Sequence, residues 1–309
     1  MLTTDADLLQ RFEAGLDPRH LDRSAVPGNI VGYGEISAIF QIQGDDETVY
    51  KRLPVFADQS AARRYAGLHA EYCRLLEKAG LHLPASATQI VSLPGRPVVL
   101  YIAQRRLTGR HFCHRRIHDL DDENSRVLIE AVAAQIARIW AFNDQAGPEI
   151  ELAIDGQLSN WVIEPSAGDA SQPMYIDTST PLMRINGVEK LDPELLLKSA
   201  PGFLRWIIRW LFLKDVMNRY YVPRLVYTDL VANLFKEQRP DLVPAATAIA
   251  NRFLADDERP LTATEIEKYY AEDKLIWTVV LAFRRIDRWL TTRMLRRRYE
   301  FILPGAIQR

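Results

Sequence analysis

The feature that most constrains the fold is a change in hydrophobic periodicity near residue 107. Before it, β-branched and aromatic residues form strand-like stretches at 30–42, 48–55, 87–93 and 97–107. One long helix, residues 58–80, is expected among them, because Leu68, Tyr72, Leu75 and Leu76 follow helical spacing. After it, helical periodicity dominates, notably at 122–145, 201–221, 242–255 and 272–298. The pattern predicts an α+β chain with a small β-rich lobe, 1–107, and a larger helical lobe, 108–309.

Composition restricts the class of protein. A chain of 309 residues exceeds the usual size of a single core, so two lobes are expected. The net charge of −1 gives no general affinity for nucleic acid. Two distant cysteines fit a reducing compartment, the first residues lack the pattern of a signal peptide, and no apolar run reaches about 18 residues. A cytoplasmic location is therefore expected.

Three features of the first lobe point toward phosphate binding. Gly32 and Gly34, followed by Ser37, lie in the first expected hairpin, where glycine lets the backbone approach a phosphate closely. Lys51 lies on the next strand, and Glu71 follows 20 residues later within the expected helix. Each of these residues is common on a surface, so their order along the chain is what carries the prediction.

The clearest chemical pattern lies downstream. Asp155 and Asn160 are separated by four residues, and a short strand-like segment, 173–177, ends in Asp177, 22 residues after Asp155. Carboxylate and amide oxygens bind Mg²⁺, and phosphoryl transfer depends on neutralising charge and positioning the attacking hydroxyl. The pattern predicts a site for a nucleotide and its cation.

Together these residues resemble the protein-kinase-like superfamily, in particular the branch of aminoglycoside and choline phosphotransferases. The resemblance implies a bilobal fold that binds ATP and Mg²⁺. It implies that Lys51 holds the phosphates and is oriented by Glu71, that Gly32, Gly34 and Ser37 cover the nucleotide, and that Arg105 and Leu107 lie in the hinge beside adenine. By the same resemblance Asp155 is the catalytic residue, and Asn160 and Asp177 are the metal ligands.

Departures from the family pattern favour a second hypothesis. Ala153 and Ile154 stand where a histidine usually precedes the catalytic aspartate, Gln157 stands where a basic residue is common, and Thr178-Ser179 follows Asp177 in place of Phe-Gly. These changes are compatible with a pseudokinase, a nucleotide-binding or scaffold protein without turnover.

Other patterns allow different interpretations. Asp229 and Asn233 imitate the catalytic loop, but their gap is one residue short and no strand ending in Asp follows at a suitable distance. Three histidines and a cysteine within 110–118 resemble zinc ligands, but they crowd together among arginines, which favours a basic surface loop or an anion contact. No Walker A motif occurs, and no histidine follows residue 118, which argues against a P-loop protein and against a Ser-His-Asp hydrolase in the helical lobe.

The segments 203–221 and 283–298 combine aromatic and basic residues, the latter with seven arginines and one aspartate. Such helices usually bury one face in the protein, and they also suit a weak contact with a membrane surface. We therefore expect an ATP- and Mg²⁺-dependent kinase that acts on a hydroxyl-bearing small molecule. No long activation segment with an Ala-Pro-Glu-like end follows Asp177, which disfavours a protein substrate.

Overall fold

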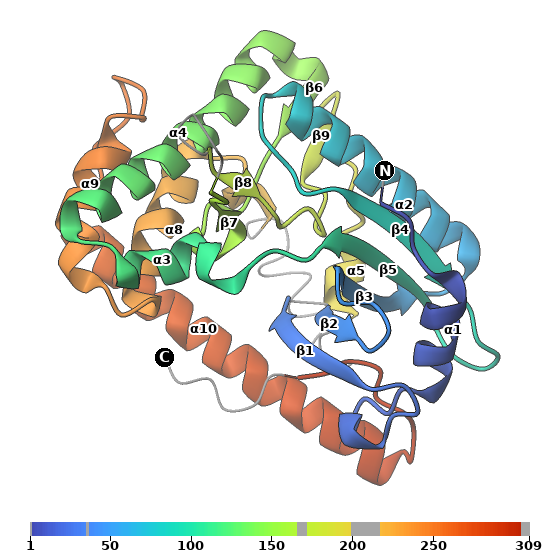
Figure 1. Cartoon of the computed structure of the whole chain (residues 1–309). Coiled ribbons are helices and arrows are strands. Elements are labelled where there is room, and N and C mark those ends of the chain that lie inside the picture. The colour runs from blue at the N-terminus through green and yellow to red at the C-terminus, as the bar shows by residue number, and fades with distance from the viewer. Residues whose placement is uncertain (1, 35–36, 166–171, 199–216, 304–309) are drawn as a thin grey trace.

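The computed structural model describes residues 2–34, 37–165, 172–198 and 217–303. A five-stranded antiparallel sheet with the order β1-β2-β3-β5-β4 forms the core of the first part of the chain (Figure 1). Its strands are β1 (Gly28–Tyr33), β2 (Ala38–Ile42), β3 (Thr48–Phe56), β4 (Ser86–Val91) and β5 (Val98–Arg105).

Helices cover both faces of this sheet. Residues alternate between the faces along β3, so Leu53 packs with α2 (Gln59–Lys78), while Tyr50 belongs to the core cluster of α1 (Ala6–Gly15). Asp58 caps the start of α2 by accepting a hydrogen bond from the backbone of Ala61. Since Lys51 lies two residues before Leu53, its side chain projects from the α2 face of the sheet.

The remaining chain is mainly helical, as the sequence predicted. The helices are α3 (Cys113–Asp119), α4 (Asp122–Ala146), α5 (Glu194–Leu197), α8 (Pro223–Lys236), α9 (Val243–Asn251) and α10 (Ala263–Trp289), and the π-helix η6 (Leu290–Met294) continues α10. The 3-10 turns are η1 (Leu21–Arg23), η2 (Gly109–His111), η3 (Gly147–Glu149), η4 (Leu158–Asn160) and η5 (Pro240–Leu242).

Two small antiparallel sheets lie between the large sheet and the helices. One has the order β10-β9-β6, and the other pairs β7 with β8. Their strands are β6 (Ile150–Leu152), β7 (Trp161–Val162), β8 (Met174–Tyr175), β9 (Met183–Ile185) and β10 (Val188–Glu189). The β7–β8 pair joins the segments that contain Asn160 and Asp177, because Trp161 pairs with Tyr175. The element order thus brings the two predicted metal ligands to the same place.

The predicted α+β class is confirmed: a small antiparallel β-rich lobe is followed by a larger, mainly helical lobe (Figure 1). The division at residue 107 stays a prediction of domain organisation. The larger buried core crosses it, since Leu53 and Leu100 share a cluster with Ile129 and Ile136. No helix among the described residues is long and apolar enough to cross a membrane.

Two local expectations differ from the structure, and a third falls mostly on residues that it does not describe. The segment 110–118 contains η2 and helix α3, with Cys113 fully buried, so it is not a surface loop. The last long helix begins at Ala263, ten residues after Phe253 and well before residue 272. Most of the expected helix 201–221 lies outside the described residues.

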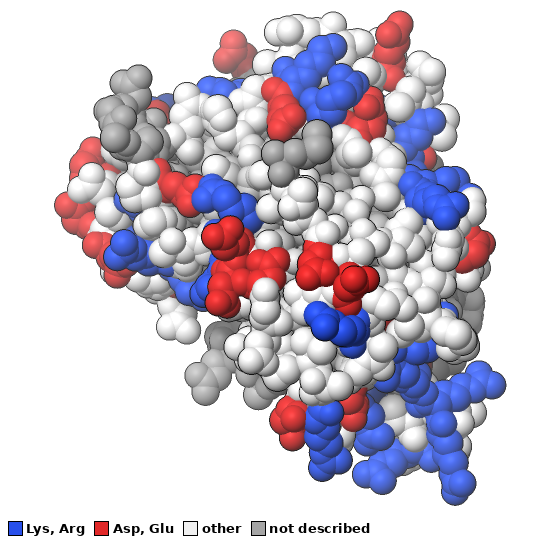
Figure 2. Space-filling model, turned by 45° about the vertical axis from the view of Figure 1, so that its right-hand side comes forward, with Lys and Arg blue, Asp and Glu red and all other residues white. Residues whose placement is uncertain are grey.

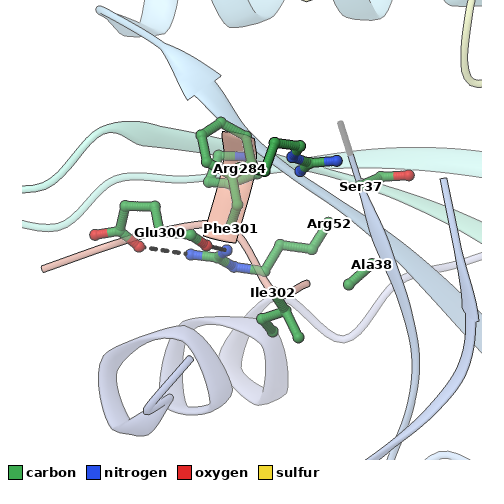
Figure 3. A pocket seen from close by; sticks show the side chains of 8 residues that line it. Ser37, Ala38, Arg52, Arg284, Glu300, Phe301 and Ile302 are labelled. Carbon is green, nitrogen blue, oxygen red and sulfur yellow. Dashed lines mark hydrogen bonds and ion pairs between the residues drawn. The ribbon is translucent and has the colours of Figure 1, made fainter. Parts of the chain in front are cut away.

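The end of the chain returns to the first sheet. Beyond η6, Tyr299 and Leu303 are buried, and Ile302 packs against the core between α1 and the sheet. Arg52, which projects from the α1 face of β3, donates hydrogen bonds to the backbone and the carboxylate of Glu300 at 2.7 and 3.0 Å. Figure 3 shows this contact beside a cavity of about 10 Å³, room for about one water molecule.

Candidate nucleotide and metal site

Lys51 and Asp177 form the centre of the candidate site. Lys51 Nζ lies 3.0 Å from Asp177 Oδ1 and donates a second hydrogen bond, 3.2 Å, to the backbone oxygen of Ile176. The Lys51 side chain is 7% exposed and that of Asp177 is 32% exposed, so the pair lies at the border between core and solvent. Two residues 126 positions apart thereby meet between the sheet and the β7–β8 pair.

The Asp177 carboxylate is held in its ionised form. Burial by itself would raise the pKa of Asp177, but the Lys51 ammonium and the hydrogen bond from Ser179 Oγ, 2.8 Å, outweigh burial and lower it. An ionised carboxylate that is partly open to solvent is the form that binds a divalent cation.

Asn160 and Asp155 lie beside this pair. The backbone N–H of Ile176 donates to the Asn160 backbone oxygen at 3.0 Å, and Asn160 Nδ2 donates to the Asp155 backbone oxygen at 3.3 Å. The backbone N–H of Gln157 donates to Asp155 Oδ1 at 3.1 Å. The three residues that the sequence analysis singled out, Asp155, Asn160 and Asp177, are therefore brought together.

The Asp155 carboxyl differs from that of Asp177 in its protonation. Burial, followed by the nearby charge of Asp229, raises the pKa of Asp155 to about 8, while the N–H of Gln157 and the charge of Lys236 act in the opposite direction. Asp177 contributes to the same rise. Two carboxyl groups with opposite pKa shifts at one site suit a group that exchanges a proton beside one that stays charged.

The residues present fit a Mg²⁺ ion bound together with a phosphate. Asp177 would supply a carboxylate oxygen, and the Asn160 amide, whose nitrogen donates to the Asp155 backbone oxygen, would supply its own oxygen. Mg²⁺ usually takes one or two protein oxygens and completes its octahedron with water and substrate phosphates. Within the described ranges, no group of three or more His, Cys, Asp and Glu side chains is placed to hold a metal by itself.

Comparison with known proteins places the chain in a family. A family model described as "Family of unknown function (DUF6206)" matches residues 29–288, which is most of the chain. The chain belongs to the DUF6206 family. No curated protein matches it.

Solved structures similar to this DUF6206 chain include WaaP in complex with acyl carrier protein, 14% identical, covering 82% of this chain and 100% of that chain, with a TM-score of 0.35. The crystal structure of WbdD is 12% identical, covers 79% of this chain and 51% of that chain, and has a TM-score of 0.35. A mutant aminoglycoside 2′-phosphotransferase in its GDP complex is 10% identical. The match covers 73% of this chain and 90% of that chain, with a TM-score of 0.35. Similarities this distant carry no argument about activity.

The predicted partner of Lys51 in the DUF6206 chain is wrong. Glu71 lies on the exposed face of α2, where it forms a 2.7 Å ion pair with Arg74. His69 occupies the inward position instead and is 2% exposed. Successive helical residues are rotated by about 100°, so a side chain two positions after His69 cannot share its face. The helix thus offers Lys51 a histidine in place of a carboxylate.

His69 connects α2 to the segment that follows Asp177. Its Nε2 lies 3.1 Å from Thr178 Oγ1, and Gln104 Nε2 donates to the same hydroxyl at 3.3 Å and to the Ile176 backbone oxygen at 3.1 Å. Burial, followed by the charge of Lys51, lowers the pKa of His69 to about 4, so the ring is neutral near pH 7. A signal for His69 was available, because it lies four residues after Tyr65 and three before Tyr72, both buried.

The predicted glycine loop is a hairpin between β1 and β2. Gly32 pairs with Ile39, and the backbone N–H of Gly34 donates to the Ser37 backbone oxygen at 3.0 Å. A Cβ atom at Gly34 would lie 2.5 Å from Ser37 Oγ, a contact that rotation of the Ser37 side chain would relieve. Contact of this hairpin with phosphate stays a prediction.

The predicted hinge lies at the end of β5. The Arg105 side chain forms an exposed ion pair with Glu164 at 2.5 Å, which links β5 to the residues after β7. Its backbone N–H is already bonded to the Ala85 oxygen at 3.1 Å and cannot also donate to a base. Leu107, the other predicted hinge residue, is partly buried, and contact of the hinge backbone with adenine stays a prediction.

The competing pattern Asp229 to Asn233 is helical. Both residues lie inside α8, where Asp229 Oδ1 accepts a hydrogen bond from Tyr269 at 2.9 Å. Asn233 Oδ1 accepts the backbone N–H of Leu158 at 3.0 Å, and Lys236 Nζ donates to Gln157 Oε1 at 3.1 Å. This helix supports the loop from Asp155 to Asn160 and does not replace it.

Proposed function

We propose that this DUF6206 chain is an ATP- and Mg²⁺-dependent phosphotransferase that acts on the hydroxyl group of a small molecule. The observation that carries the proposal is the Lys51–Asp177 ion pair, with Asn160 and Asp155 bonded into the adjoining segment. An ammonium, an ionised carboxylate, an amide and a carboxyl of raised pKa, brought together from three separate segments, are the groups that phosphoryl transfer requires.

Each group has a distinct role in this proposal. Lys51 binds nucleotide phosphate oxygens, and Asp177 with Asn160 binds the cation, which would neutralise charge on the transferred phosphoryl group. Asp155 accepts a hydrogen bond, and finally the proton, from the acceptor hydroxyl. The acceptor oxygen forms a bond to the terminal phosphorus as the bond to ADP breaks. A pKa of about 8 means that Asp155 receives this proton readily but is mostly protonated in the free protein near pH 7.

The alternative, a pseudokinase that binds nucleotide without turnover, has one specific observation in its favour. The same pKa shift reduces the fraction of Asp155 that is ionised and able to act as a base. Nucleotide binding by Lys51 and Asp177 is common to both proposals, and turnover separates them.

The first experiment is a thermal shift with Mg²⁺-ATP and, separately, Mg²⁺-GTP. We expect ligand to raise the Tm of the wild type, and of the control Lys268→Ala on the exposed face of α10, but not of Lys51→Ala or Asp177→Ala. A ligand present at about 100 times its Kd stabilises by about 2.7 kcal/mol. Equal stabilisation of all four proteins would contradict the site.

The second experiment measures ATP turnover with a panel of hydroxyl-bearing small molecules. Asp155→Asn keeps the shape of the side chain and removes its ability to take a proton, so we expect turnover to fall by at least about 100-fold while the thermal shift persists. Nucleotide binding without turnover in the wild type would favour the pseudokinase.

The expected cytoplasmic location and the weak contact with a membrane surface also stay predictions. Of the two basic aromatic segments, 203–221 lies mostly outside the described residues. The other, at the end of α10, is described and exposed, which makes it the candidate surface for that contact.

A further inference from the structure

A hollow of about 380 Å³ lies between the start of the chain and the end of α10, on a part of the molecule that the proposed phosphotransfer does not use. Arg19 and His20, which follow α1, contribute one wall, and the last turns of α10 with η6 contribute the other. The residues that line it are Arg19, His20, Arg285, Arg288, Trp289, Thr292 and Arg293.

The hollow is strongly cationic although the whole chain carries a net charge of −1. Four of its seven lining residues are arginines, and none is acidic. Figure 2 shows Lys and Arg side chains gathered at the lower right of the molecule, where α10 ends in Figure 1. The Asp17 carboxylate, next to Arg19 in the chain, is engaged with the backbone, since it accepts the N–H groups of Arg19 and His20 at 2.9 and 3.3 Å.

Guanidinium groups that converge on a hollow have the geometry to bind phosphate. Each arginine can donate two parallel hydrogen bonds to phosphate oxygens, and its charge is retained at every physiological pH. These donors come from two segments that are nearly 270 positions apart in the chain. They lie together because the end of α10 docks beside the residues that follow α1. The chemistry therefore points to a ligand with one or more phosphate groups.

Exposed apolar side chains next to the hollow distinguish a lipid from a soluble phosphate. Ile286 is 46% exposed, Trp289 is 56%, Met294 is 64% and Leu295 is 60%. A soluble phosphate would leave these side chains in water, whereas a bilayer surface offers phosphate at the level of the arginines and acyl chains just below. Tryptophan beside arginine is the combination that favours the interface of an anionic membrane.

We propose that this surface docks on an anionic membrane, with lipid phosphate groups in the hollow and Trp289 inserted at the interface. The π-helix η6 supports this arrangement, because the altered winding presents Thr292 and Arg293 to the hollow together with Arg288 and Trp289. The proposal is independent of the phosphotransfer, since Lys51 and Asp177 lie outside the hollow.

Cosedimentation with vesicles tests the proposal. We expect the full chain to bind vesicles of phosphatidylcholine mixed with phosphatidylglycerol, not phosphatidylcholine alone, and to bind less as salt rises. Arg288→Gln with Arg293→Gln removes two positive charges and should weaken binding about 25-fold, at roughly fivefold per arginine. The matched control, Arg126→Gln with Arg252→Gln, removes two charges that pair with Glu123 and Glu130 near the other end of the molecule and should bind like the wild type.

Trp289→Ser separates the lipid from a soluble anion. We expect this variant to bind vesicles at least about tenfold more weakly than the wild type. Both proteins should bind inorganic pyrophosphate, a soluble probe for the arginines, with the same weak affinity in calorimetry. Vesicle binding that Trp289→Ser leaves intact, or pyrophosphate binding without vesicle binding, would overturn membrane docking. Equal loss in the arginine pair and its control would overturn the assignment to the hollow. The thermal shift with Mg²⁺-ATP should be unchanged in all these variants, so failure here and failure of the phosphotransferase proposal give different results.

Discussion

Lys51 is bound by an ionised carboxylate, and a neutral imidazole lies nearby on α2. Asp177 binds its ammonium directly, while His69 approaches from α2 without charge. Because α2 supplies no carboxylate at this point, Asp177 balances the charge of Lys51 and would also ligate the cation. A bound nucleotide could separate these two roles of Asp177, because a phosphate would contact Lys51 while the cation binds Asp177.

The low pKa of His69 predicts how stability depends on pH. The folded-state pKa, about 4, lies below the ordinary histidine value of about 6.5, so between these values the unfolded chain binds a proton that the folded chain does not. Stability from this group is complete above about pH 6.5 and falls as pH drops toward 4, by at most about 1.4 kcal/mol per pH unit. Urea unfolding at pH 7 and pH 5 measures the change.

His69→Gln provides the comparison for that measurement. Glutamine can still bond to Thr178 but does not titrate, so we expect a shallower decline between pH 7 and pH 5. Burial also lowers the pKa of His114 to about 4, and this second contribution is present in both proteins and cancels in the difference. If the free energy of unfolding fell equally between pH 7 and pH 5 in the wild type and the variant, the assignment to His69 would be contradicted.

At the scale of residues, the order of residue types along the chain predicted the site residues better than a fixed distance from Lys51 to a helical carboxylate did. Lys51, Asp155, Asn160 and Asp177 were chosen because their types follow one another on suitable elements, and the structure brings them together. Glu71 was chosen by the same reasoning, but its side chain points away from the site. It lies two positions after the inward-facing His69, and residues two positions apart in a helix lie on different faces. The buried residues Tyr65 and Tyr72 carried the better signal for His69.

At the scale of elements, α8 determines the shape of the loop from Asp155 to Asn160. The two elements pack tightly at Gly156, where an added Cβ atom would lie 2.8 Å from Val226 Cγ1 and 3.1 Å from its backbone oxygen. Asn233 and Lys236 add hydrogen bonds to Leu158 and Gln157. The helix and the loop therefore pack as one unit.

We expect Asn233→Ala to destabilise the chain by about 1–3 kcal/mol, because the buried backbone N–H of Leu158 loses its acceptor. It should also reduce the thermal shift with Mg²⁺-ATP, since Asn160 lies in the same loop. Asn251→Ala is the control, because Asn251 makes two similar bonds to Leu261 in another part of the helical lobe. An equal nucleotide response in both variants would count against support of the site by α8.

The sequence did not predict α8, for a physical reason. Most of its residues from Val226 to Leu234 are buried, so no polar stripe marks a period of 3.6. The amphipathic helix α2 and the long helix α4 each retain a solvent face and were predicted close to their observed bounds. Hydrophobic periodicity identifies a helix that has one face in water, but it does not identify a helix that is buried on all sides.

At the scale of the molecule, the two ends of the chain are joined through a buried ionic network. Arg52 is 2% exposed and Glu13 is 1% exposed, and they form a bidentate pair at 2.6 and 2.8 Å. Arg96 also contacts Glu13, and Glu300 contacts Arg52 at 3.0 Å. Burial would raise the pKa of Glu13, but Arg52, Tyr101 and Arg96 together lower it, so the carboxylate stays charged.

We expect Arg52→Met to destabilise the chain by about 3–5 kcal/mol, because Glu13 loses its bidentate partner while it stays buried. Adding Glu13→Gln to that variant should recover part of the loss, and chemical denaturation of the four proteins of this cycle measures the coupling. Additive losses would show that the two side chains act independently, contrary to the geometry.

The contact of Glu300 with Arg52 has a consequence for biosynthesis. A ribosome releases the sheet lobe long before it makes residue 300, so the nascent lobe carries an arginine on its surface side that still lacks one carboxylate, and an apolar patch that Ile302 has yet to cover. The lobe can adopt its strand order early, but it reaches full stability only after Glu300 and Ile302 have left the ribosome. A chain that stops before Glu300 should therefore be recognised by chaperones and proteases as incomplete.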